Sequence, residues 1–166
     1  MMAESGHAEV VTLLHREALY LDEQRWDDWL ALYTEDVEYW VPAWKSEHEQ
    51  TADPRREISL IYLNSRARLE ERVWRIRSGR SAANLVLPRT AHAISNILIE
   101  SATAESADVR CLCITNIYDP KRRSEYRTVA RQALGLVRLG EEWRIRSKKV
   151  VVLNDSLRTK LDFYML

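Results

Sequence analysis

The sequence has few of the residues that separate or cross-link domains. Its 166 residues include only four glycines and four prolines, so no flexible linker divides it, and the length suits one domain spanning 1–166. The only two cysteines stand close together in RCLC, which is too few for a disulfide framework. We therefore expect a single domain that folds with reduced cysteines.

Long hydrophobic runs and an excess of one charge are also missing. No run approaches the ~20 apolar residues that a membrane-spanning helix needs, and the segment MMAESGHAEV lacks the hydrophobic part of a secretory leader. The 25 basic and 25 acidic residues cancel, whereas a nucleic-acid-binding domain usually carries a basic excess. The composition predicts a cytoplasmic protein that binds neither membranes nor nucleic acid.

The common motifs of catalytic and cofactor-binding sites are not found. The sequence has no G-x-S-x-G element and no glycine-rich phosphate loop. Cys111 and Cys113 form one C-x-C pair, whereas zinc and iron–sulfur sites need about four ligands, so we interpret both as small buried residues on one strand face. No two histidines share a helix or strand at metal-ligand spacing; the four are His7, His15, His48 and His92. We assign no catalytic, cofactor-binding or metal-ligating residue.

The first part of the chain has helical periodicity. Helices are predicted over about 8–33, in two pieces, and again over about 64–78, where Gly79 follows the last turn. Between them, DVEYWVPAW alternates like a strand and KSEHEQTADPRRE is a polar loop.

The second part alternates like β-structure. Four long runs with short polar connections predict an antiparallel meander over about 88–155, followed by a C-terminal tail over 156–166. Strands this long imply strong curvature, and Gly135 is a candidate bend. The element order predicts an α+β fold in which N-terminal helices pack on one face of a strongly curved, mainly antiparallel sheet, a half-open cone.

The segment ERVWRIRSGRS, residues 71–81, places four arginines around a tryptophan. On a helix, Leu69, Val73 and Ile76 form one apolar stripe, and the arginines fall on both sides of it. No single basic face results, which argues against nucleic-acid binding. Two interpretations stay open: a solvated helix face, or a protein interface, where Trp and Arg are enriched. The interface candidates here are Trp74, Arg77 and Arg80.

Several segments together resemble the small (β) subunit of aromatic-ring-hydroxylating, Rieske-type dioxygenases. They are REALYLDEQRWDDWLALYTEDVEYWVPAW, ADPRREISLIYLNSRARLEERVWRIRSGRS, LPRTAHAISNILI and VVVLNDSLRTKLDFYML, and they cover nearly the whole chain in the family's order. The loop SEHEQTADPRREISLIY is most similar to the branch acting on benzoate- or anthranilate-type carboxylates. In AANLVLPRTAH the sequence departs from the family by being apolar at 84–87, so Arg89 is the only interface candidate carried over there.

The resemblance implies a cystatin-like or NTF2-like cone and a structural, non-catalytic role. It also implies a catalytic α subunit as partner, with a Rieske [2Fe-2S] cluster and a mononuclear Fe(II), in an α3β3 hexamer. Electrons would reach that α subunit from NADH through a reductase or ferredoxin, and this chain would hold no cofactor.

An alternative hypothesis is a stand-alone dehydratase or isomerase of the same cone fold. His92 or His48 would act as acid–base group with Asp28 or Asp36. This hypothesis predicts an open polar pocket lined by those side chains, whereas apolar side chains plugging the cone would count against it.

Overall fold

The computed structural model describes residues 4–79, 86–154, 157 and 159–166. Its helices are α1 Glu4–Asp22, α2 Trp26–Ala31, α3 Arg66–Arg77 and the short 3₁₀ helix η1 Phe163–Met165. Its strands are β1 Tyr33–Pro42, β2 Ser59–Leu63, β3 Arg89–Ala102, β4 Ser106–Asp119, β5 Ser124–Leu139 and β6 Glu142–Val152. No helix in these described ranges is long and apolar enough to cross a membrane.

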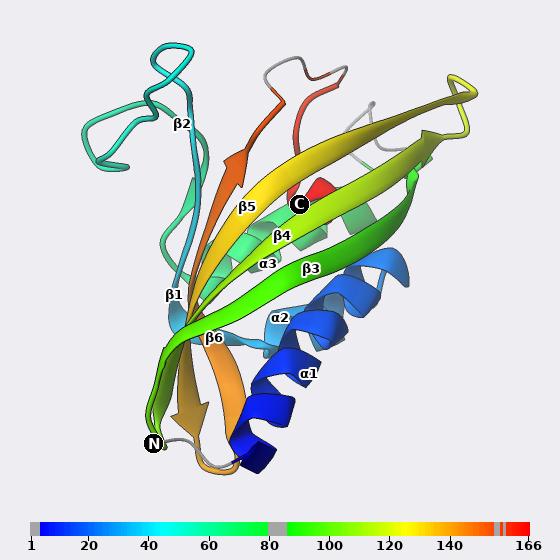
Figure 1. Ribbon diagram of the computed structural model, residues 1–166. Helices are drawn as coiled ribbons and strands as arrows, with labels where there is room; N and C mark the ends of the chain where they lie inside the picture. The colour runs from blue at the N-terminus through cyan, green and yellow to red at the C-terminus, as the bar shows by residue number, and fades with distance from the viewer. Residues whose placement is uncertain (1–3, 80–85, 155–156, 158) are drawn as a thin grey trace.

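The strands form one six-stranded sheet in the order β2-β1-β6-β5-β4-β3 (Figure 1). Strands β3 to β6 make the antiparallel meander that the alternating sequence predicts, and β1 joins β6 in parallel. The α+β class with a mainly antiparallel sheet is therefore confirmed. Strand β2 and the parallel β1–β6 pairing were not predicted, because both depend on contacts between residues far apart in the sequence.

Helix α2 ends at Ala31, two residues earlier than the predicted helical boundary at 33. The carbonyl oxygen of Leu32 accepts a hydrogen bond from the amide of Ile145 at 2.8 Å, and Tyr33 already pairs with that residue in the sheet. The tertiary pairing with β6 takes these residues out of the helix, although their sequence pattern suits either structure.

Breaks in strand register accompany the strong curvature of the long strands seen in Figure 1. In β3 the register shifts between Ser95 and Leu98, and Asn96 between them has a φ of 52°. In β5 the register shifts after Gly135, where a Cβ atom would stand 2.6 Å from the hydroxyl oxygen of Ser147. A side chain at Gly135 would displace the Ser147 hydroxyl, which accepts a hydrogen bond from the Gly135 amide at 3.2 Å, and the bend predicted at this residue coincides with a break in register.

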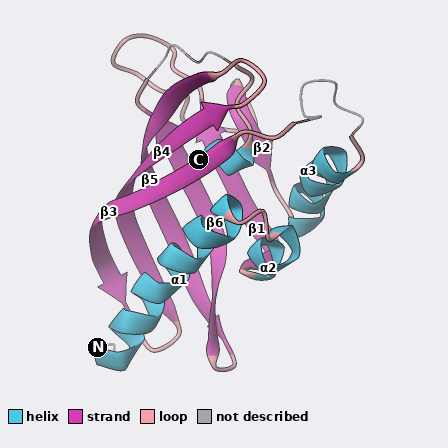
Figure 2. Ribbon diagram, turned by 90° about the vertical axis from the view of Figure 1, so that its right-hand side faces the viewer, coloured by secondary structure: helices cyan, strands magenta, loops and turns pink. Residues whose placement is uncertain are grey.

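The helices lie on one face of the sheet, as Figure 2 shows, with α1 running across it and α3 beside β1 and β2. Helix α3 buries Leu69, Val73 and Ile76, which confirms the predicted apolar stripe. The C-terminal segment enters the same core, where the Phe163 ring stacks on Trp29 with 4.6 Å between ring centroids. The cone is therefore filled by side chains from both ends of the chain.

Candidate functional site

A histidine and an aspartate form a close pair inside the cone. Asp22 ends α1 and His92 lies on β3, and His92 Nδ1 is 2.5 Å from Asp22 Oδ1. The His92 amide and the Thr90 hydroxyl also donate to the same carboxylate, each at 2.9 Å. Burial alone would raise the pKa of Asp22, but the hydrogen bonds and charge of His92, with the bond from Thr90, lower it overall.

This pair has the groups that acid–base catalysis needs, but the histidine side chain is not accessible from solvent. The His92 side chain is 1% exposed, and its Nε2 is buried without a hydrogen-bond partner among the described residues. A substrate would have to reach that nitrogen for proton transfer. The buried C-terminal residues Phe163, Tyr164 and Met165 belong to the hydrophobic core of the cone, and the enclosed His92 ring favours a structural role for the pair.

The acid–base pairs predicted from the sequence are not formed. Asp28 is exposed and bonds Arg25 at 2.8 Å, and Asp36 is exposed and lies 3.5 Å from Arg146. His48 lies in an exposed loop. Sequence reasoning selected His92 but missed Asp22, because spacing along the chain does not show which carboxylate at a helix end will face a distant strand.

A second buried polar group joins α1 to β6. Lys148 Nζ donates to Glu17 Oε1 at 2.8 Å, and that oxygen also accepts from Trp29 Nε1 at 3.0 Å and the Tyr33 hydroxyl at 2.7 Å. Burial tends to raise the pKa of Glu17, but the charge of Lys148 and the hydrogen bonds from Lys148, Trp29 and Tyr33 together lower it overall. Burial likewise tends to lower the pKa of Lys148, but the charge of Glu17 and its hydrogen bond, together with neighbouring groups, raise it overall. Both groups stay charged, paired and closed to solvent.

A signal for this pair was present in the sequence. Lys148 alternates with Val150 and Val152, so it shares their inward face of β6. Glu17 falls between Leu13, Leu14 and Ala18 on the apolar face of α1. Two opposite charges on two buried faces predict an internal ion pair, since an unpaired buried charge costs several kcal/mol.

The cysteines pack as the sequence predicted. Cys111 and Cys113 are buried free thiols on β4, and burial raises the pKa of Cys111 to about 12. Within the described ranges, no cluster of three or more His, Cys, Asp or Glu residues could hold a metal ion.

The structure places three of the four interface candidates, two on α3 and one on β3. Trp74 is 54% exposed on α3. Arg77 makes two hydrogen bonds, of 3.0 and 2.9 Å, to the carboxylate of Asp27 and so ties α3 to α2. Arg89, at the start of β3, is exposed with its guanidinium 5.7 Å from the centre of the Tyr118 ring. Arg80 lies outside the described residues.

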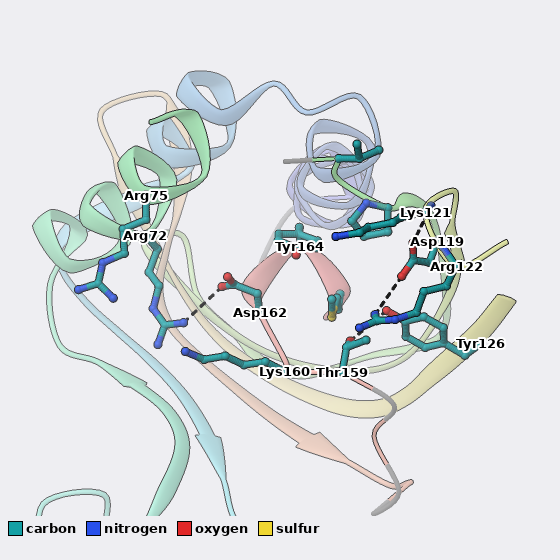
Figure 3. A pocket seen from close by; sticks show the side chains of 13 residues that line it. Arg72, Arg75, Asp119, Lys121, Arg122, Tyr126, Thr159, Lys160, Asp162 and Tyr164 are labelled. Atoms are coloured by element: carbon teal, nitrogen blue, oxygen red, sulfur yellow. Dashed lines mark hydrogen bonds and ion pairs between the residues drawn. The ribbon is translucent and has the colours of Figure 1, made fainter. Parts of the chain in front are cut away.

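A cationic pocket of about 290 Å³ opens between α3, the β4–β5 turn and the C-terminal segment (Figure 3). Two of its basic residues are neutralised: Arg72 pairs with Asp162 at 3.4 Å and Arg122 with Asp119 at 3.1 Å. Three further basic residues line it, namely Arg75, Lys121 and Lys160. Sequence reasoning missed this pocket, because its charges come from three segments that only the fold brings together.

The fold and interior define the class: a cystatin-like, NTF2-like cone whose centre is packed with side chains. A solved putative scytalone dehydratase from Novosphingobium aromaticivorans shares this fold, with a TM-score of 0.70 over 95% of this chain and 89% of that one, at 14% identity. At that identity the likeness shows the fold alone.

The family follows from closer comparisons. Residues 16–159 match the family model described as ring hydroxylating beta subunit. The chain is 38% identical to benzoate 1,2-dioxygenase subunit beta of Acinetobacter baylyi over 94% of this chain and 91% of that one. The crystal structure of the benzoate 1,2-dioxygenase β subunit of Burkholderia mallei matches with a TM-score of 0.79 and 34% identity, covering 96% of both chains.

The chain therefore belongs to the family of ring-hydroxylating β subunits. The resemblance drawn from the sequence is confirmed, and the β-subunit hypothesis prevails over a stand-alone dehydratase or isomerase.

Proposed function

We propose that this chain is the structural β subunit of a multi-component dioxygenase that dihydroxylates an aromatic carboxylate of the benzoate type. The observation that carries the proposal is the 38% identity to a benzoate 1,2-dioxygenase β subunit along nearly the whole chain. The buried, unapproachable His92 supports a role without chemistry of its own.

The proposed partner is an α subunit that carries a Rieske [2Fe-2S] cluster and a mononuclear Fe(II), in a cytoplasmic α3β3 hexamer supplied with electrons by a reductase or ferredoxin. Trp74, Arg77, Arg80 and Arg89 are the proposed contacts with neighbouring subunits. Arg77 would contribute through the ion pair with Asp27 that it already makes in the single chain.

Co-expression with the α chain encoded beside this one tests the proposal. We expect the two chains to elute together in size-exclusion chromatography, with all iron in the α chain, and the complex to hydroxylate benzoate when a reductase and NADH are added. The β chain alone should turn over nothing. A β chain that stays monomeric with every candidate α chain would refute the proposed assembly.

A further inference from the structure

We propose that the cationic pocket in Figure 3 binds the carboxylate of a small aromatic acid, at a site separate from the packed interior of the cone. The site is formed by this chain alone. Neither the Asp22–His92 pair nor the Glu17–Lys148 pair lines it.

The charges of the pocket select an anion. Five basic and two acidic side chains line it, and both acidic side chains already accept from arginines. Within the described part of the chain, Arg75, Lys121 and Lys160 have no carboxylate at ion-pairing distance, and all three are exposed to solvent. They come from α3, the β4–β5 turn and the C-terminal segment, so their mutual repulsion would be relieved by a bound anion.

The two carboxylates of the pocket are already held by groups of this chain. Asp162 is held by Arg72 and by the amide of Phe163 at 2.9 Å, and Asp119 accepts from the amides of Lys121 and Arg122 at 2.9 and 3.1 Å. Burial raises the pKa of Asp162. These bonds occupy the carboxylates and leave the three remaining cations available to a ligand.

The uncharged lining selects an organic anion with a ring. Val86, Pro88, Met165 and the ring of Tyr126 share the pocket with the cations, and the Tyr126 hydroxyl is fixed by Thr159 at 3.1 Å. A volume of about 290 Å³ is at the small end of ligand sites, which suits one ring and one carboxylate. An apolar wall beside cations favours a benzoate-like molecule over a bare inorganic ion.

The choice of an aromatic acid rests on the proposed function, whereas the anion site rests on the pocket itself. The first measurement is binding of benzoate to the full β chain, by calorimetry and by amide chemical shifts in ¹⁵N-labelled protein. Benzyl alcohol and acetate are matched probes: the first keeps the ring without the charge, and the second keeps the carboxylate without the ring. We expect benzoate to shift the amides of Lys121, Arg122 and Lys160, and to bind at least tenfold more tightly than either matched probe.

Two double variants with the same change in charge make the test specific. Lys121→Gln with Lys160→Gln removes two pocket cations and should weaken benzoate binding at least tenfold. Arg55→Gln with Arg56→Gln removes two exposed cations from the 52–57 loop and should leave binding within twofold. All four side chains are exposed, so folding should survive, which circular dichroism checks.

Several results would overturn the inference. One is benzoate binding that is equally strong in both double variants. The others are binding of benzyl alcohol, or of acetate, that is as strong as the binding of benzoate. Loss of benzoate binding when the α chain is present would show that the site receives a partner's carboxylate instead. A wild-type chain that binds benzoate but never assembles refutes only the proposed function, and one that assembles without binding benzoate refutes only this inference.

Discussion

At the scale of single residues, the interior of this protein is defined by two polar pairs rather than by a catalytic group. Glu17 and Lys148 are both charged and both closed to solvent, and Asp22 holds the His92 side chain, which is itself closed to solvent. A buried charge is tolerated when an opposite charge and hydrogen bonds compensate it, as the three donors to Glu17 do. The two pairs also connect the helix α1 to the two strands β6 and β3.

Replacing Lys148 by Met should destabilise the protein by about 3–5 kcal/mol, because Glu17 would keep its buried charge without a partner. The double variant Glu17→Gln with Lys148→Met should recover part of the loss, since Trp29 and Tyr33 can still donate to a Gln oxygen. Urea unfolding measures the change in unfolding free energy of the single and of the double variant. Lys149→Met on the other face of β6 is the control and should cost far less; an equal cost would contradict the ion-pair argument.

The pH dependence of stability should report the Asp22–His92 pair. The folded pKa of Asp22 lies below its ordinary value of 3.8, so the folded state favours the carboxylate. The stability it contributes is present above pH 3.8 and is lost as the pH falls through the folded pKa. The unfolding free energy of the wild type minus that of Asp22→Asn should therefore be constant from about pH 6 to 5 and shrink below pH 4. A difference that grows in acid would contradict this.

At the scale of elements, the C-terminal segment 159–166 closes the cone. Its 3₁₀ helix begins where the Asp162 side chain accepts from the Phe163 amide, and Tyr164, Met165 and Leu166 are buried behind it. Thr128 on β5 donates to the Met165 carbonyl at 2.5 Å, which ties the segment to the sheet. The sequence pattern predicted that these residues form a C-terminal tail, but in the structure they are part of the hydrophobic core.

Phe163→Ala should lower the free energy of unfolding by about 3–5 kcal/mol, the usual cost of deleting a buried phenylalanine. The ring is 1% exposed and stacks on Trp29, so its loss leaves a cavity. Leu153→Ala, at an exposed position just after β6, is the matched control and should cost well under 1 kcal/mol. Guanidinium unfolding of both variants measures the two losses in unfolding free energy. Equal unfolding midpoints for the two variants would show that the segment is not part of the core.

At the scale of the whole molecule, the family assigns this chain to a larger assembly, and its surface must provide the contacts. Trp74 is a large exposed aromatic residue on α3, and Arg77 beside it already links two helices. Aromatic and arginine side chains dominate the energetics of interfaces. The face of α3 away from the core is the first place to test.

Trp74→Ala and Arg80→Glu should each weaken association with the α chain by tenfold or more, while changing the unfolding free energy of the β chain by less than about 1 kcal/mol. Leu139→Ala removes a hydrophobic side chain of similar exposure at the end of β5 and should leave association unchanged. Analytical ultracentrifugation of α–β mixtures measures the effect. Normal assembly of both test variants would show that α3 faces solvent in the complex.

Local patterns in the sequence were enough to predict the class of fold, the meander and the stripe of α3, because periods of two and 3.6 residues depend only on neighbours along the chain. They also placed Cys111 and Cys113 inside a strand face. The tertiary structure alone decided which charges meet. Asp22 and His92 are 70 residues apart, so no spacing rule could pair them. For Glu17 and Lys148, which are 131 residues apart, the sequence shows two opposite charges on two buried faces, but only the fold brings those faces together. The cationic pocket could not be predicted for the same reason: its charged residues are far apart in the sequence. Its three segments become neighbours only when the sheet curves around the C-terminal residues.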